Sequence, residues 1–433
     1  MSSASLSLKE QKEAFVTGHE GTTVGELLLM CLSAPIGVWL QSRLDLFSPG
    51  QKIAAEALLV LLPMTLVQTN FLYPWGVLIL GAETAVALWL ICTQKQPTQP
   101  PTTAKSERLS SLTCYRSSVM FLTCVAILAV DFPLFPRRFA KTEVTGYGLM
   151  DLGAGSFVVS AGLLPHMRQS SYAKRILPLL VMGILRFVAN KGLDYQEHMS
   201  EYGIHWNFFL TLAVVMPLAS LCLKMTQSSL WILPLILMGC YQLLLSTGLQ
   251  EYIETVPRQC SSSDTPLCDM FAANREGILG CIGYLSLYLA SHYIGRVCLW
   301  NTTNSIKQRR TLLFGTTALL WGLHAALASI IPASRRSTNA TFCVWTLAHN
   351  VLLLSLLDAV PVSPPPILDA INRQGLLVFI VANLLTGLVN ISFNTLQAND
   401  ATALGILLLY LSAVCGFALL LDSRLFLMKK KKD

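Results

Sequence analysis

Thirteen long apolar runs limit the class of fold that this chain can adopt. A helix needs about 20 mostly apolar residues to cross about 30 Å of hydrocarbon. The runs are bounded by charged or turn-forming residues, and 53% of the chain is hydrophobic while only 13% is charged. So few charges cannot cover the surface of a soluble protein of this size. We therefore predict an all-α, polytopic integral membrane protein with about 13 transmembrane helices, and we exclude a nucleic-acid-binding protein.

The predicted spans lie near residues 24–40, 53–67, 73–92, 119–130, 149–164, 176–189, 205–223, 230–249, 277–299, 312–331, 342–357, 376–393 and 402–421.

The spans divide the chain into three parts: an N-terminal segment at 1–23, a single transmembrane domain at 24–421 and a Lys-rich tail at 422–433. Basic residues concentrate on cytosolic loops of membrane proteins, and one side here holds about twice as many as the other. We therefore predict a lumenal N-terminus and a cytosolic C-terminus. This orientation makes the linker at 93–118 cytosolic and the loop at 250–276 lumenal.

The tail ends in Lys429 to Lys432, which resembles the dilysine retrieval signal of endoplasmic reticulum membrane proteins. The alternative is that the lysines simply anchor the tail on the cytosolic side, as the positive-inside rule describes.

Cys260 and Cys268 share the predicted lumenal loop, where an oxidising compartment permits a disulfide; the alternative is two free thiols. The sequon at Asn339 is also predicted to be lumenal and to accept a glycan.

The first polar cluster begins with Asp131, directly after an apolar run. Pro133 and Pro136 cannot continue that helix, so the chain must turn and hold Asp131 at the membrane surface. A partly desolvated carboxylate can accept a hydroxyl proton, and guanidinium groups bind phosphate. An interfacial belt of aromatic and basic residues is the alternative. The charged residues that follow in this cluster are Arg137, Arg138, Lys141 and Glu143, and we assign Arg137, Arg138 and Glu143 to substrate binding.

A second cluster places Arg186, Asn190 and Asp194 at intervals of four, followed by His198. One helix face would therefore carry these side chains from the membrane interior to the lumen. A lipid-facing Arg is costly, so we expect this face to line a cavity or to pair with another helix. We assign its four residues to substrate binding.

The remaining clusters flank the ninth and twelfth spans. Asn274 and Arg275 begin the ninth, and Tyr284 and His292 lie farther along it; we assign these four to substrate binding. Beside the twelfth span lie the polar stretch 369–375 and three deeper asparagines, which we expect to hydrogen-bond across helices. The three are Asn383, Asn390 and Asn394.

The standard motifs of metal, phosphate and nucleophile chemistry are absent from the sequence. The sequence has no His-Glu-x-x-His pair, no phosphate-binding loop and no Gly-x-Ser-x-Gly elbow. We predict no metal site and no permanently bound cofactor.

Four stretches combine charged, aromatic and small residues in a specific order: Lys12–Gly18, Phe135–Glu143, Tyr195–Asn207 and Ile371–Phe379, the last continuing through Ala382–Asn390. Through these stretches the chain resembles the inositol acyltransferases of GPI-anchor biosynthesis, called PIG-W in animals and Gwt in yeasts. The resemblance covers nearly the full length.

The resemblance implies a multi-pass protein of the endoplasmic reticulum membrane, in contact with its lipids. It implies transfer of a fatty acyl chain, typically palmitoyl, from acyl-CoA as co-substrate to the 2-hydroxyl of inositol in glucosaminyl-phosphatidylinositol. It places the reaction on the lumenal side, and the family's acid and lysine match Asp131 and Lys141. These two are the predicted catalytic residues. The sequence identifies no protein partner.

Two other classes of function fit the same charges. A transporter or lipid flippase would use intramembrane charges to bind and release a solute. A membrane scaffold would use them for folding or assembly.

Overall fold

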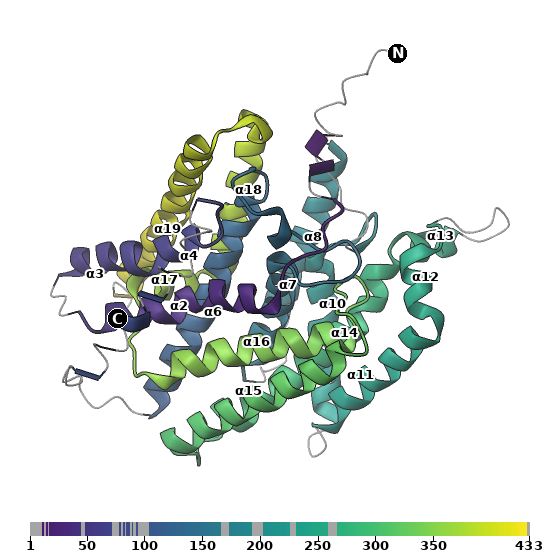
Figure 1. The fold of residues 1–433 in the computed structure, drawn as a ribbon, viewed down its shortest axis with the longest axis horizontal. Helices are drawn as coiled ribbons and strands as arrows, with labels where there is room; N and C mark the ends of the chain where they lie inside the picture. The colour runs from purple at the N-terminus through teal and green to yellow at the C-terminus, as the bar shows by residue number, and fades with distance from the viewer. Residues whose placement is uncertain are drawn as a thin grey trace. The chain divides into compact units, whose positions relative to one another are not determined.

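The computed structural model is built from helices, with no strand among the residues that it describes (Figure 1). These residues are 11–12, 14–15, 17–44, 48–71, 78, 81–82, 84–86, 89, 92–93, 104–165, 173–192, 202–225, 231–258 and 266–430.

Nine helices within those ranges are long and apolar enough to cross a membrane. They match nine of the predicted spans, and two shorter apolar helices, Leu149–Gly162 and Ile176–Leu185, match the fifth and sixth. The second predicted span forms a helix broken by a π-helical segment. Most of the third lies outside the described residues. The all-helical, multi-pass character is thus confirmed, whereas the count of thirteen stays a prediction.

The fourth span is longer than the sequence pattern indicates. Helix α6 (Ala104–Ala129) begins 15 residues before the predicted start at 119, and its apolar part begins at Ser110. Arg108 and Arg116 interrupt the apolar run in the sequence and so obscure the helix. Much of the predicted linker at 93–118 is therefore helical.

The chain divides into two compact units, each made of segments far apart in the sequence. Unit 1 comprises Met1–Gly21, Lys141–Asn304 and Gly315–Asn350. Unit 2 comprises Thr22–Ala140, Ser305–Phe314 and Val351–Asp433. Two long helices, α15 (Ile306–Ala328) and α16 (Ala340–Ala359), contribute residues to both units.

Unit 1 is organised around α14 (Arg275–Ile294), most of whose residues are buried. This helix contacts α7, α10 and α11, and α10 also contacts α8. Small residues permit the close approach: a Cβ at Gly162 would lie 2.6 Å from the carbonyl oxygen of Tyr288. The other helices of unit 1 are α7 (Leu149–Gly162), α8 (Ala173–Gly192), α10 (Phe208–Met225), α11 (Ile232–Leu244), α12 (Gln250–Thr255) and α13 (Pro266–Ala273), with π-helical segments at Leu245–Leu249 and Gly295–Leu299.

Unit 2 packs α17 (Pro366–Arg373) and α18 (Gly375–Ser392) against α6, and α19 (Asp400–Lys430) against both. In Figure 1, α18 and α19 are the paired yellow-green and yellow helices. The other helices are α2 (Val24–Ser42), α3 (Pro49–Glu56) and α4 (Leu62–Leu66), with a π-helical segment at Ala57–Leu61 and 3₁₀ turns at Arg137–Phe139 and Thr395–Gln397.

Two buried acids fasten the helices of unit 2. The side chain of Glu56, which is fully buried, accepts hydrogen bonds from the backbone N–H groups of Ile367 (2.6 Å) and Leu368 (2.7 Å). These are N–H groups of the first turn of α17, which no carbonyl within the helix can satisfy. Asp358 pairs with Arg309 at 2.9 Å and accepts a bond from Ser111 of α6.

Candidate functional site

Asp131 lies in the turn that follows α6, where the two prolines place it, and only 4% of it is exposed. Its Oδ2 accepts a hydrogen bond of 2.6 Å from Nδ2 of Asn390, in the last turns of α18. The same Nδ2 also donates to the carbonyl of Thr386, one turn earlier. The carboxylate is therefore buried and held by a side-chain amide from a helix 259 residues away along the chain.

Arg137 makes its hydrogen bonds to the loop that contains Asp131. The guanidinium donates to the carbonyl oxygens of Val130 (2.8 Å), Phe132 (3.0 Å) and Phe135 (3.0 and 2.9 Å). Burial lowers the pKa of Arg137 to about 10, while the negative charge of Asp131 acts in the opposite direction. The side chain therefore stays cationic at neutral pH, and these bonds hold the carbonyls on both sides of Asp131.

Arg138 points to another partner. Its Nε and Nη2 bind the carboxylate of Glu26, in the first turn of α2, at 2.8 to 3.2 Å. The guanidinium also lies over the ring of Phe139, 4.7 Å from its centre. The ion pair is partly exposed, with 32% of the Arg138 side chain accessible. Arg138 thus ties the loop to α2.

Lys141 and Glu143 belong to unit 1, and both are partly buried. The backbone N–H of Glu143 donates to the carbonyl of His19. Between them, Thr142 donates from its N–H (2.9 Å) and its hydroxyl (2.8 Å) to Asp151. Asp131 belongs to unit 2, so the structure describes the two predicted catalytic residues in separate units.

Asp151 is a buried acid that our sequence analysis missed. It lies in the first turn of α7, is 1% exposed and forms an ion pair of 2.5 Å with Arg335. Arg335 is itself 5% exposed and lies over the ring of Tyr202. The signal was present, because an acid inside an otherwise apolar run of membrane-spanning character needs a partner.

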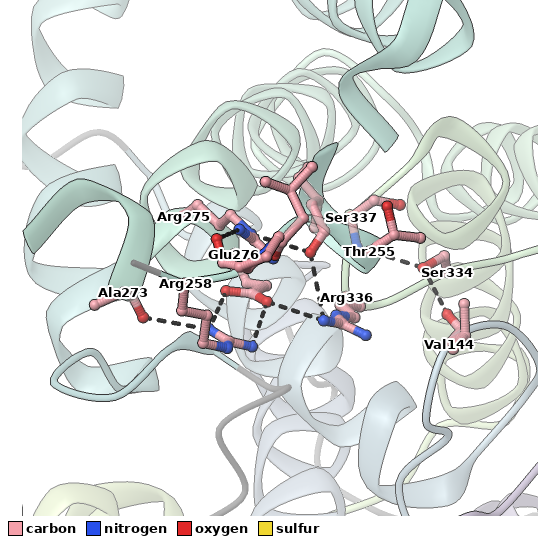
Figure 2. A network of polar contacts seen from close by, with 12 residues as sticks. Val144, Thr255, Arg258, Ala273, Arg275, Glu276, Ser334, Arg336 and Ser337 are labelled. Carbon is pink, nitrogen blue, oxygen red and sulfur yellow. Dashed lines mark hydrogen bonds and ion pairs between the residues drawn. The ribbon is translucent and has the colours of Figure 1, made fainter. Parts of the chain in front are cut away.

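The third cluster forms a network within unit 1, and Figure 2 shows Glu276 between two arginines. The carboxylate binds Arg258 at 2.6 and 2.9 Å and Arg336 at 3.2 Å, and the side chain of Glu276 is fully buried. Arg275 donates to the carbonyls of Ile253, Val256 and Pro257. These contacts hold the end of α12 and residues 256–258 against the start of α14.

Two other predicted binding residues of this cluster, Asn274 and His292, also bond within the protein. Asn274 accepts a bond from the N–H of His205 (2.8 Å) and donates to the carbonyl of Met270. His292 lies 3.2 Å from the carbonyl of Gly162, at the end of α7, and Tyr284 is buried in the middle of α14. The structure brings Asn274 and Arg275 together at the start of α14, with Tyr284 and His292 farther along the helix.

Most side chains of the second cluster lie outside the residues that the structure describes. Arg186 and Asn190 lie in α8, but only their backbone is described, and Asp194 and His198 lie outside the described residues. Their assignment to substrate binding stays a prediction.

Cys268 is disulfide-bonded, whereas Cys260, its predicted partner, lies outside the described residues. The pairing stays a prediction. Among the described residues, no three His, Cys, Asp or Glu side chains are grouped so that they could hold a metal ion.

Asn339 has a structural role at the start of α16. Its Oδ1 accepts a bond of 3.0 Å from the N–H of Phe342, and its Nδ2 donates to the carbonyl of Pro332 at 2.8 Å. The residue is fully buried. A glycan would attach to this Nδ2, so the folded geometry favours the helix cap over glycosylation.

Most of the polar residues described above are engaged in structural bonds, which limits the chemistry that they can support. A buried carboxylate held by a side-chain amide can act as a general base, because the amide fixes its orientation and does not take up the proton. The arginines beside it are engaged in bonds to the protein. Asp131 is therefore the described group best suited to proton transfer.

The comparisons with known proteins cover nearly the whole chain. The GWT1 family model matches residues 8–421. A protein of Aspergillus oryzae named GPI-anchored wall transfer protein 1 is 35% identical, over 96% of this chain and 98% of its own. A protein of the same name from Yarrowia lipolytica is 39% identical over 72% of each chain. The glucosaminyl-phosphatidylinositol-acyltransferase PIGW of Bos taurus is 30% identical, over 95% of this chain and 97% of its own.

Proposed function

Because the chain belongs to the GWT1 family, we propose that it is an acyltransferase that acylates the inositol of glucosaminyl-phosphatidylinositol. The observation that carries this proposal is the match to the bovine acyltransferase, which extends over 95% of this chain. The family model matches residues 8–421, a range that includes Asp131 and the loop around it. The buried carboxylate gives the reaction a suitable base.

The proposed acyl donor is acyl-CoA, with a palmitoyl chain. In the reaction, the 2-hydroxyl oxygen of inositol attacks the thioester carbonyl while Asp131 accepts the hydroxyl proton. The new C–O ester bond forms, the C–S bond breaks, and the proton passes from Asp131 to the departing thiolate of CoA. Transfer is direct, so no acyl-enzyme intermediate is needed.

Lys141 is proposed to orient the carboxylate or to stabilise the oxyanion that develops on the thioester carbonyl. This role rests on the family resemblance and on its place in the chain, 10 residues after Asp131. Arg137 and Arg138 already bond to carbonyls and to Glu26, so the proposed reaction assigns them no phosphate. The acyl chain would lie among apolar helices, which need no polar signature to bind it.

The proposed place of the reaction is the lumenal side of the endoplasmic reticulum membrane. The bias of Lys and Arg supports it, since it puts the turn after α6 on the side opposite the basic tail.

The test is transfer of labelled palmitate from palmitoyl-CoA to glucosaminyl-phosphatidylinositol by the purified protein in detergent. We expect Asp131→Asn to lower kcat about 10²-fold to 10⁴-fold and Lys141→Ala about 10²-fold to 10³-fold. The matched control is Asp369→Asn, which removes a partly exposed acid in α17 and should leave activity unchanged.

The assay tests the proposed reaction and the proposed catalytic residues separately. If the folded wild-type protein transfers no palmitate with both substrates present, the transporter becomes the better explanation. If all the variants are as active as the wild type, the enzyme stands and the catalytic pair is wrong.

A further inference from the structure

Two sets of hydrogen bonds within unit 2 hold Asp131 in place. The first comes from α18. A carboxylate on a freely rotating side chain spends little time in the orientation that proton transfer requires. The 2.6 Å bond from Asn390 restricts that rotation. Asn390 is fixed in turn by its bond to the carbonyl of Thr386, on the same helix. An amide does not titrate near neutral pH, so it orients the base without competing for the proton.

The second set of bonds holds the loop backbone. Arg137 donates to Val130 and Phe132, the residues directly before and after Asp131. Asn70 supports the same loop from the end of α4, by donating to the carbonyls of Pro133 (3.0 Å) and Leu134 (2.7 Å). The Cα position of Asp131 is therefore determined by bonds on both sides.

We infer that Asn390 and Arg137 are positioning residues that orient the Asp131 carboxylate for acyl transfer. This inference rests on the function proposed above. It gives Arg137 a role different from the phosphate binding that its charge suggests in the sequence. The four bonds from Arg137 end on three carbonyl oxygens of its own loop, which is the arrangement of a backbone clamp.

The test for Asn390 compares the pH–rate profiles of the purified wild type, Asn390→Ala and Asn390→Asp. We expect Asn390→Ala to lower kcat about 10-fold to 100-fold, with KM for both substrates within about twofold. The acid limb of the profile should move to higher pH, because a carboxylate that loses a hydrogen-bond donor is protonated more readily. Asn390→Asp should move it further, because a second negative charge has the same effect.

The control is Asn383→Ala on the same helix. Asn383 is also partly buried, but its Nδ2 donates to the carbonyl of Phe379 within α18. Its removal should leave kcat and the pH profile unchanged. In an Asp131→Asn background, Asn390→Ala should cause no further loss of kcat, since the group that it positions is gone.

Arg137→Lys distinguishes a clamp from a phosphate ligand. A lysine keeps the charge but cannot reach the three carbonyls in the fixed geometry of a guanidinium. Positioning predicts a fall in kcat of about tenfold or more with KM unchanged, whereas phosphate binding predicts a rise in KM with kcat unchanged.

Two results would overturn the inference in different ways. If Asp131→Asn is inactive while Asn390→Ala keeps the wild-type kcat and pH profile, positioning by Asn390 is wrong and the proposed function stands. If Asp131→Asn is fully active, the catalytic assignment and the inference fail together. Should Asn390→Ala not fold, an unshifted acid limb in the nearly isosteric Asn390→Asp would refute the role.

Discussion

The buried acids of this protein differ in their hydrogen-bond donors: some bind a charged guanidinium group, whereas Asp131 binds the neutral amide of a side chain. Asp151 and Asp358 face the guanidinium groups of Arg335 and Arg309. Asp131 accepts a bond from the amide of Asn390. A charge taken out of water costs several kcal/mol unless it is paired, so a guanidinium partner stabilises an acid strongly in its charged form. An amide donor carries no full charge, so this contact orients the carboxylate while perturbing its basicity less.

The ion pair of Asp151 leads to a prediction about stability. Asp151→Asn leaves Arg335 buried without this counter-charge, which should lower the free energy of unfolding by about 3–5 kcal/mol. Thermal unfolding of the purified protein in detergent measures the effect.

Asp369→Asn is the control for Asp151→Asn. It breaks a pair in which 52% of the Arg373 side chain is exposed and should cost less than about 1 kcal/mol. Equal shifts for the two variants would show that the buried pair is no more important than the exposed one.

Asp131 could be identified from the sequence because it combines an acid, the end of an apolar run and two prolines nearby. Its partner could not, because Asn390 is one of several asparagines in the last third of the chain. We expected Asn383 and Asn390 to bond across helices. Asn390 does bond to a distant segment, but its partner Asp131 lies in the turn after α6, and the amide of Asn383 donates to a carbonyl of its own helix. Contacts between distant segments depend on packing, which a single sequence does not display.

Short helices are where the sequence pattern is least informative. Helix α17 has eight residues and lies in a stretch that we read as a loop, since no apolar run marks it. Its apolar side chains Ile367, Leu368, Ala370 and Ile371 are nevertheless buried. The long spans were predictable because each must contain enough apolar residues to cross the membrane, whereas α17 is defined by its contacts.

Glu56 of α3 caps the first turn of α17, so a substitution at Glu56 should destabilise α17. Glu56→Ala removes the acceptor for the N–H groups of Ile367 and Leu368, both of which belong to buried residues. We expect the free energy of unfolding to fall by about 1–3 kcal/mol per unsatisfied group.

Glu56→Gln keeps an acceptor oxygen and should lose less than Glu56→Ala. Hydrogen exchange at the start of α17 reports the local effect, because an uncapped helix end opens more often. Faster exchange in Glu56→Gln than in Glu56→Ala would contradict the capping role.

At the scale of the whole chain, orientation follows from charge. The net charge is +7, and four consecutive lysines lie near the C-terminus. Because of anionic lipids and the positive-inside rule, we expect such a tail to lie in the cytosol. The predicted count of thirteen spans, which is odd, would then place the N-terminus in the lumen.

Epitope tags at the two ends test this orientation. When only the plasma membrane is permeabilised, an antibody should reach a C-terminal tag and fail to reach an N-terminal one until the endoplasmic reticulum membrane is also opened. Equal access to both tags would mean an even number of spans. A tag inserted after Asn304, in the loop that precedes α15, should be as accessible as the C-terminal tag, because this loop is predicted to lie on the same side of the membrane.

With the sequon at Asn339 on the predicted lumenal side, folding and glycosylation would compete for the same Nδ2 atom. Oligosaccharide transfer takes place on chains that are still emerging, whereas Nδ2 of Asn339 becomes inaccessible once α16 has begun. A sugar at this position would mark molecules in which transfer preceded folding. The fraction of molecules glycosylated at Asn339 would then equal the fraction that had not folded in time. Any change that slows formation of α16 would increase that fraction.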